Sequence, residues 1–213
     1  TTDLRTRRYR YGQQPQIGAW NVARLLEAMV PLMDEPELLH EVLDGYTDSY
    51  ATFQNEMWAS KLGLDEFKNE DESLIRDLNE LLQLVETDMT IFFRLLSSLQ
   101  EPSVKSLSDA FYDPATIPMA EWNAWLTTWW ERVNSAPNRE VMLSSNPKYV
   151  LRNWMAQLAI EAAEAGDQSI CQELSILFKN PYDEQIELEE KWFKKRPEWA
   201  RHKIGCSMLS CSS

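Results

Sequence analysis

The residues of this sequence that are best able to carry out chemistry are three cysteines, Cys171, Cys206 and Cys211. Cys211 is the third residue from the carboxyl end, in a short polar segment where a thiol is accessible and no core needs it. Cys206 is close enough along the chain to pair with it, and a cysteine outside this chain is the alternative. Cys171 lies among apolar residues of an expected helix and is interpreted as a small buried hydrophobe. We therefore predict Cys211 and Cys206 as the redox thiols.

Other reactive side chains do not form a convincing site. The two C-terminal cysteines and His202 do not follow the spacing of zinc ligands, so we expect no structural metal. Asp183 and Glu184 could act as an acid/base pair, but neighbours in sequence seldom converge on one substrate atom. We interpret residues 180–185 instead as a structured turn with capping side chains.

The sequence motifs of common catalytic and cofactor sites are also absent. There is no Gly-rich phosphate loop, no HExxH helix and no nucleophile elbow. His40 lies on an expected amphipathic helix without partners that would make it a ligand or a base. We therefore assign no catalytic, cofactor-binding or metal-binding residue within this chain.

Charge and composition exclude two classes of partner. The formal net charge of −13 argues against non-specific binding to nucleic acid, which requires a basic face. No apolar run approaches the ~20 residues that cross a bilayer, so no membrane contact is expected. Three cysteines are too few for a secreted disulfide scaffold, which indicates a reducing compartment. The first ten residues are basic, and they are either a solvated segment or a strip that contacts phosphate or an acidic neighbour.

Apolar residues recur at steps of three and four through most of the chain, which predicts an all-α protein. In the first half of the chain we expect helices over 17–33, 39–62 and 75–85, and one that is capped by Asp88 and ends before Pro102. In the second half we expect helices from Pro118 to Trp130 and from Pro147 to Gly166, one that is capped by Asp167 and ends at Asn180, and one over 187–194. The last helix is expected to be short and exposed, with i,i+4 pairs Glu187/Lys191 and Glu190/Lys194. Loops are expected around 63–72, 101–117 and 134–146, and no strands or fixed-period repeat are indicated.

Three tryptophans, Trp122, Trp125 and Trp129, share one face of the helix that follows Pro118. Such a cluster could be a platform on which bases or sugars stack. Aromatic residues at helical spacing far more often pack in a core, so we predict a core role.

Several longer segments of the chain are distinctive. They are Asn146-Pro147-Lys148-Tyr149-Val150-Leu151-Arg152-Asn153 with its continuation to Gly166-Asp167, Asn180-Pro181-Tyr182-Asp183-Glu184-Gln185, Arg196-Pro197-Glu198-Trp199-Ala200, and Ser210-Cys211-Ser212-Ser213. Together these segments resemble selenoprotein O (SelO). Near the start, Arg8-Tyr9, Gln14-Pro15 and Trp20-Asn21 look like the same family's stretch just past its metal-binding motif. The matches occur in one order along nearly the whole chain, and only the middle, roughly residues 60–115, shows none.

The resemblance implies a protein-kinase-like fold of the pseudokinase kind. SelO proteins bind ATP in an inverted orientation, use magnesium, and transfer AMP to Ser, Thr or Tyr hydroxyls of proteins. In some members the position of Cys211 is selenocysteine, and the tail thiol can pair with a cysteine on the activation-loop side. Residues 1–12 contain no cysteine, so Cys206 is the local candidate partner.

The resemblance also implies a division of the chain. Residues 1–135 are expected to be the helical part of a kinase-like C-terminal lobe, and residues 136–213 a C-terminal helical extension with a redox tail. The family's Gly-rich loop, nucleotide-binding Lys and metal-binding Asp and Asn precede this region. ATP and Mg²⁺ are therefore expected in the intact parent, and this fragment alone is expected to be inactive. Its expected partners are protein substrates and the rest of the kinase-like domain.

Two other functions remain open from the residues alone. A non-catalytic helical interaction module is the alternative. A thiol oxidoreductase acting through Cys206 and Cys211 ranks last, because the spacing lacks CxxC geometry and no thioredoxin-like strand–helix pattern is present. The resemblance implies a mitochondrial location in a eukaryote and a cytoplasmic one in a bacterium.

Overall fold

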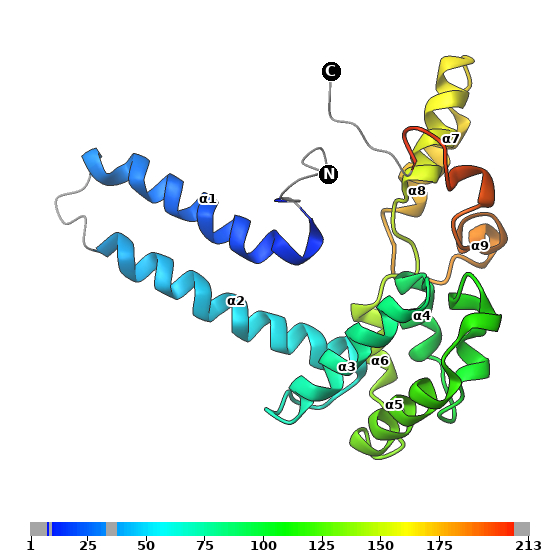
Figure 1. Ribbon diagram of the computed structural model, residues 1–213. Helices are drawn as coiled ribbons and strands as arrows, with labels where there is room; N and C mark the ends of the chain where they lie inside the picture. The colour runs from blue at the N-terminus through cyan, green and yellow to red at the C-terminus, as the bar shows by residue number, and fades with distance from the viewer. Residues whose placement is uncertain (1–7, 9, 33–37, 207–213) are drawn as a thin grey trace. The chain divides into compact units, whose positions relative to one another are not determined.

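The computed structural model describes residues 8, 10–32 and 38–206 (Figure 1). The all-α prediction is confirmed: within these residues the regular structure is helical, and an isolated antiparallel bridge pairs Thr87 with Phe111. The chain divides into two compact units at the boundary between Asn55 and Glu56. None of the helices in the described ranges is long and apolar enough to cross a membrane.

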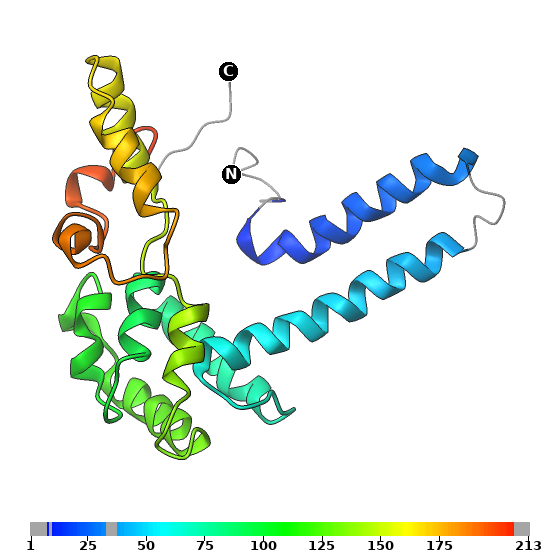
Figure 2. The same ribbon diagram turned by 180° about the vertical axis from the view of Figure 1, so that it is seen from behind.

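The first unit is an antiparallel pair of long helices (Figures 1 and 2). Its elements are η1 (Tyr11–Gln13), α1 (Gln14–Met29), η2 (Val30–Leu32) and α2 (Leu38–Leu62), whose last turns belong to the second unit. The helices meet at Gly18, where an added β-carbon would clash with the Tyr46 hydroxyl, so a larger residue there would displace this ring. The Arg8 guanidinium lies 4.4 Å from the centre of the Trp20 ring, so one residue of the basic start packs against α1 through a cation–π contact.

The helix pair leaves much of its apolar surface uncovered, and α1 has no buried residue. Leu25 is 61% exposed and Phe53 is 66% exposed. An apolar face of this size on two neighbouring helices favours association. We therefore expect the chain expressed alone to self-associate as concentration rises in sedimentation velocity runs, and the double variant Leu25→Glu/Phe53→Glu to stay monomeric. A wild-type chain that remains monomeric at the highest concentration contradicts this expectation.

The second unit begins with a tryptophan-rich core. Around it lie α3 (Asp71–Leu84), α4 (Met89–Leu96), η3 (Val104–Ala110), η4 (Pro114–Thr116), α5 (Met119–Arg132) and α6 (Arg139–Ser145). Trp122 and Trp129 are fully buried, and Trp125 is nearly so, which confirms the predicted core role. Two indole N–H groups are satisfied inside: Trp125 Nε1 donates to Leu74 O at 2.9 Å and Trp129 Nε1 to Leu62 O at 2.9 Å.

The second unit continues into a smaller core. It is formed around α7 (Asn153–Glu164), α8 (Ser169–Leu177), α9 (Ile186–Trp192) and η5 (Glu198–Ala200), with Tyr149, Trp154 and Trp192 at its centre. The first buried cluster runs from Ala59 to Met142 and the second from Tyr149 to Cys206. The domain boundary predicted after residue 135 stays a prediction.

Two sequence predictions about helix ends were wrong. The loop expected over 134–146 contains α6, because the Asn138 side chain accepts from Val141 N at 3.3 Å and starts a helix there. The helix expected from Pro147 begins only at Asn153. The reason is tertiary: the backbone N–H groups of Lys148 and Tyr149 donate to Pro181 O at 2.9 and 3.0 Å, which holds the segment extended.

The predicted short helix near residue 190 is present as α9, but it is not simply exposed. Trp192 is buried against Trp154 in a stacked arrangement with ring centres 5.7 Å apart. The predicted i,i+4 partner of Lys191 is replaced by Glu173, whose carboxylate lies 2.6 Å from Lys191 Nζ. Contacts with α8 thus stabilise α9 more than the ion pairs predicted within its own surface do.

Candidate functional site

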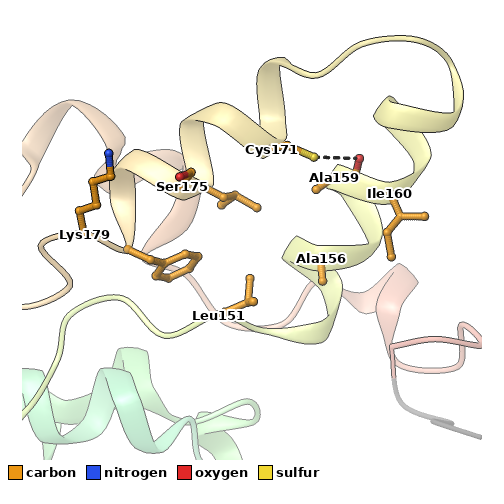
Figure 3. A pocket seen from close by; sticks show the side chains of 9 residues that line it. Leu151, Ala156, Ala159, Ile160, Cys171, Ser175 and Lys179 are labelled. Atoms are coloured by element: carbon orange, nitrogen blue, oxygen red, sulfur yellow. Dashed lines mark hydrogen bonds between the residues drawn. The ribbon is translucent and has the colours of Figure 1, made fainter. Parts of the chain in front are cut away.

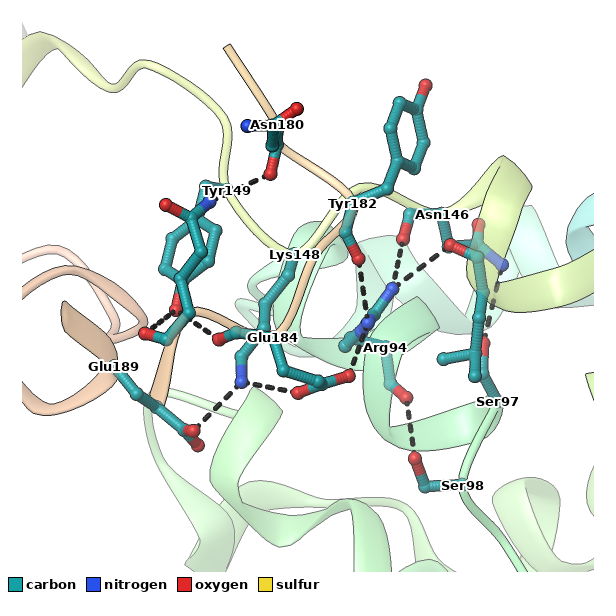
Figure 4. Close-up of polar contacts among 12 residues, drawn as sticks. Arg94, Ser97, Ser98, Asn146, Lys148, Tyr149, Asn180, Tyr182, Glu184 and Glu189 are labelled. Atoms are coloured by element: carbon teal, nitrogen blue, oxygen red, sulfur yellow. Dashed lines mark hydrogen bonds and ion pairs between the residues drawn. The ribbon is translucent and has the colours of Figure 1, made fainter. Parts of the chain in front are cut away.

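The candidate site lies where two of the sequence segments singled out above meet in space (Figure 4). The extended stretch before α7 lies against the turn over 180–185 through the two backbone bonds to Pro181 O. The Tyr149 hydroxyl adds a third link, since it donates to Glu184 O at 2.8 Å. Gln185 has a left-handed φ of 41°, and its side chain donates to Leu177 O and Asn180 O at 3.1 and 2.8 Å. The predicted structured turn with capping side chains is therefore confirmed.

Glu184 is the centre of this site because its carboxylate binds two buried cations. Arg94 Nη2 lies 2.5 Å from Glu184 Oε1, and Lys148 Nζ lies 2.6 Å from Glu184 Oε2. Lys148 Nζ also lies 2.8 Å from Glu189 Oε2. The Arg94 and Lys148 side chains are only 6% and 3% exposed, so both charges need these carboxylates.

The guanidinium of Arg94 also satisfies three backbone carbonyls. Its Nη1 donates to Leu143 O and Asn146 O, each at 3.0 Å, and its Nη2 donates to Tyr182 O at 3.0 Å. One side chain on α4 thereby joins the end of α6 to the turn over 180–185. We call Arg94, Lys148, Tyr149, Glu184 and Glu189 the Arg94 network.

Three groups of the Arg94 network, Lys148, Tyr149 and Glu184, have shifted pKa values. Burial would lower the pKa of the Lys148 ammonium, but its hydrogen bonds with Glu184 and Glu189 outweigh burial and raise this pKa. Lys148 in turn lowers the pKa of the Glu184 carboxyl, against burial and with help from Arg94. Burial raises the pKa of the Tyr149 hydroxyl. None of these three pKa values is shifted toward 7. The Arg94 network is therefore suited to holding the structure and not to transferring protons.

A second ion pair joins the same parts of the chain. The Asp88 side chain caps α4 by accepting from Ile91 N at 3.1 Å, as the sequence predicted. Both carboxylate oxygens also accept from the Arg152 guanidinium, with Nη2 at 2.7 Å from Oδ1 and Nη1 bonded to Oδ2. Asp88 is 4% exposed, so its charge depends on this bidentate partner.

Lys61 is a partly buried lysine that has no carboxylate within ion-pair distance among the described residues. Its Nζ donates to Asn146 Oδ1 at 2.7 Å and lies 4.0 Å from the centre of the Phe93 ring. Burial lowers the pKa of this amine from 10.5 to about 8. The folded state therefore releases this proton at lower pH than the unfolded state does.

This difference predicts a pH-dependent stability. Below about pH 8 the folded protein carries the cost of a buried charge, and that cost disappears as pH rises toward 10.5, where the unfolded state also loses the proton. Relative to the Lys61→Met variant, we expect the wild type to gain about 1–2 kcal/mol between these pH values, after discounting for partial exposure. Urea denaturation at a series of pH values measures this, with Lys105→Met as the matched exposed control. Parallel curves for wild type and Lys61→Met contradict it.

The predicted redox thiols are only partly described. Cys211 lies outside the described residues. Cys206 is buried at 6% exposure in the smaller core, and its carbonyl accepts from Asn153 Nδ2 at 2.9 Å. Whether either thiol is redox-active stays a prediction. Asp183 and Glu184 do not form an acid/base pair around a common point. Glu184 is bound to Arg94 and Lys148, whereas the Asp183 side chain is exposed and makes no ion pair with any described residue.

Cys171 was predicted as a buried hydrophobe, and the structure corrects this in part. It is only partly buried and lines an apolar groove of about 550 Å³ between α7 and α8 (Figure 3). Its thiol donates weakly to Ala159 O at 3.7 Å. Ile160, also lining the groove, is 50% exposed. The groove is thus open to solvent.

Within the residues that the structure describes, no three His, Cys, Asp or Glu side chains are grouped so as to hold a metal ion. His40 and His202 are both exposed. The residue that sequence reasoning missed is Arg94, and Glu184 was considered without the cation that it binds. A signal was present, since Arg94 is the one charged residue of α4, a short helix that is otherwise almost entirely apolar. A cation in such a helix must be paired when the helix is buried.

Comparison with known proteins gives a consistent result. The family model described as "Protein adenylyltransferase SelO" matches residues 2–179. Among the relatives that the chain matches are three named "Protein nucleotidyltransferase YdiU". The relative from Flavobacterium johnsoniae is 45% identical, that from Aromatoleum aromaticum 43% and that from Rhodopirellula baltica 41%. Each match covers 100% of this chain. It covers 43%, 42% and 44% of the three relatives, in the same order. The chain therefore spans less than half the length of these relatives.

Proposed function

The chain belongs to the SelO family, and we propose that it forms the C-terminal helical part of a protein nucleotidyltransferase that transfers AMP from ATP to Ser, Thr or Tyr hydroxyls of proteins. The observation that carries this proposal is the family match through residues 2–179. It is supported by relatives named protein nucleotidyltransferases, which are 41–45% identical over the whole chain.

In this proposal the chain contributes packing, and the nucleotide chemistry lies elsewhere in the longer protein. Nucleotidyl transfer requires carboxylates that hold Mg²⁺ and groups that bind the phosphates. The carboxylate of Glu184 is instead committed to Arg94 and Lys148. We therefore propose that ATP and Mg²⁺ are held outside this chain, and that its partners are the rest of a kinase-like domain and the protein substrates.

A labelling experiment tests the transfer reaction. The native protein, captured with an antibody against residues 200–213, is incubated with Mg²⁺, proteins of the same lysate and ATP labelled on either the α- or the γ-phosphate. Covalent α-label on protein hydroxyls without γ-label is the expected result, and the 213-residue chain alone is expected to transfer neither. Transfer of γ-label indicates a kinase, and either that result or the absence of both labels contradicts the proposal.

Redox control by the tail is a further part of the proposal. Cys211 would exchange with the disulfide of oxidised glutathione and then with a second protein thiol, forming a protein disulfide and releasing reduced glutathione. We expect Cys211→Ser in the intact protein to abolish any dependence of AMP transfer on reductant. Cys206→Ser should do the same if Cys206 is the partner and should leave the dependence unchanged if the partner lies elsewhere. Undiminished dependence in Cys211→Ser contradicts redox control by this residue.

The named relatives are bacterial, which favours the cytoplasmic location over the mitochondrial one.

The second candidate function is a non-catalytic helical interaction module. The exposed apolar side chains of α1 and α2 are the observation that favours it, since they offer surface to another protein. The two candidates differ in whether the chain acts as part of a longer polypeptide.

A further inference from the structure

The second unit has a groove between α3 and α5 whose lining residues lie outside the Arg94 network. It encloses about 310 Å³, and its two walls are helices that pack directly on each other. Residues 73, 77, 80 and 84 recur along one side of α3 and line it, and residues 121, 124, 125 and 128 line it from α5. We call this the α3–α5 groove.

The floor of the α3–α5 groove is apolar and firmly held. Leu81 and Trp125 lie in it and are buried at 6% and 5% exposure. The Trp125 ring is fixed, because its indole N–H donates to Leu74 O at 2.9 Å. Leu84, also lining the groove, is 64% exposed. An apolar side chain from a partner would therefore find apolar surface both in the groove and at its open end.

The rim of the α3–α5 groove is acidic, with Asp77, Glu80 and Glu121 among its lining residues. Asp77 is paired at 3.0 Å with Arg76, an exposed neighbour. Glu80 and Glu121 are exposed and make no ion pair with any described residue. Two carboxylates thus remain open to cations at the edge of an apolar hollow.

We propose that the α3–α5 groove docks a basic peptide segment, with an apolar side chain on Leu81 and Trp125 and with Arg or Lys side chains at Glu80 and Glu121. Charge complementarity selects this occupant. Nucleic acid and anionic lipid carry negative charge and would be repelled by the carboxylates of the rim. Docking in the groove does not depend on nucleotidyl transfer.

The test uses the 213-residue chain and a fluorescein-labelled peptide, Ala-Arg-Leu-Leu-Arg-Arg-Ala, in an anisotropy titration. We expect saturable binding that weakens at least about tenfold with Glu80→Lys/Glu121→Lys, because two attractive charges become repulsive. The matched control is Glu164→Lys/Glu190→Lys. It changes the net charge equally at two exposed glutamates on α7 and α9, and it is expected to weaken binding less than about twofold.

Two further arms separate docking from general attraction. Leu84→Ser, at an exposed position that the fold does not need, should weaken binding by about threefold or more. A peptide with both leucines replaced by serine should bind at least about tenfold more weakly. Equal weakening by the groove and control charge reversals, equal binding of the serine peptide, or no saturable binding overturns the proposal.

Discussion

Replacing Arg94 by methionine is expected to lower the free energy of unfolding by about 3–5 kcal/mol. The methionine keeps the aliphatic length but removes the donors to Leu143 O, Asn146 O and Tyr182 O and the partner of Glu184. Three buried or partly buried carbonyls then lack a donor, and each such group costs about 1–3 kcal/mol when it is not rehydrated.

Urea denaturation followed by tryptophan fluorescence measures this loss in the second unit, because every tryptophan except Trp20 lies beyond the boundary at Asn55. Arg76→Met is the matched control. The Arg76 side chain is 64% exposed and, among the described residues, pairs only with Asp77, so its removal should change stability by less than about 0.5 kcal/mol. Equal effects of the two variants would show that the Arg94 network does not hold the fold.

The second large effect is expected from Asp88→Ala, which should cost about 3 kcal/mol. It removes the cap of α4 and also leaves Arg152, 19% exposed, without the carboxylate that binds it through both oxygens. The loss should therefore exceed that of a cap alone, which is typically about 1 kcal/mol.

Asp113→Ala is a matched control for the capping part. Asp113 accepts from Ala115 N at 3.1 Å at the start of the short helix η4, but it is exposed and has no ion pair among the described residues. We expect it to cost about 0.5–1 kcal/mol in the same urea assay. If Asp88→Ala costs no more than Asp113→Ala, the bidentate pair with Arg152 contributes nothing to stability.

The sequence predicted those features that neighbouring residues decide. The cap at Asp88 and the tryptophan face of α5 were correct because each depends on side chains within one or two helical turns. The stop at Gly166 was also correct, since its φ of +87° suits glycine at the end of α7.

The errors and omissions share a physical cause, which is contact between distant parts of the chain. Pro147 was a reasonable first residue of a helix, but the N–H groups that follow it bond to Pro181 O. The pairing of Arg94 with Glu184 joins residues 90 positions apart, which no local periodicity reveals. The resemblance to SelO marked both segments around residues 146–153 and 180–185, yet only the structure shows that they meet.

The intact mass of the native polypeptide, captured with an antibody against residues 200–213, tests most directly whether this chain acts as part of a longer nucleotidyltransferase. The relatives are more than twice as long as the chain, so we expect a mass well above 24.9 kDa. A mass near 24.9 kDa would show that the cell makes only this helical piece, and the non-catalytic interaction module would then be the function.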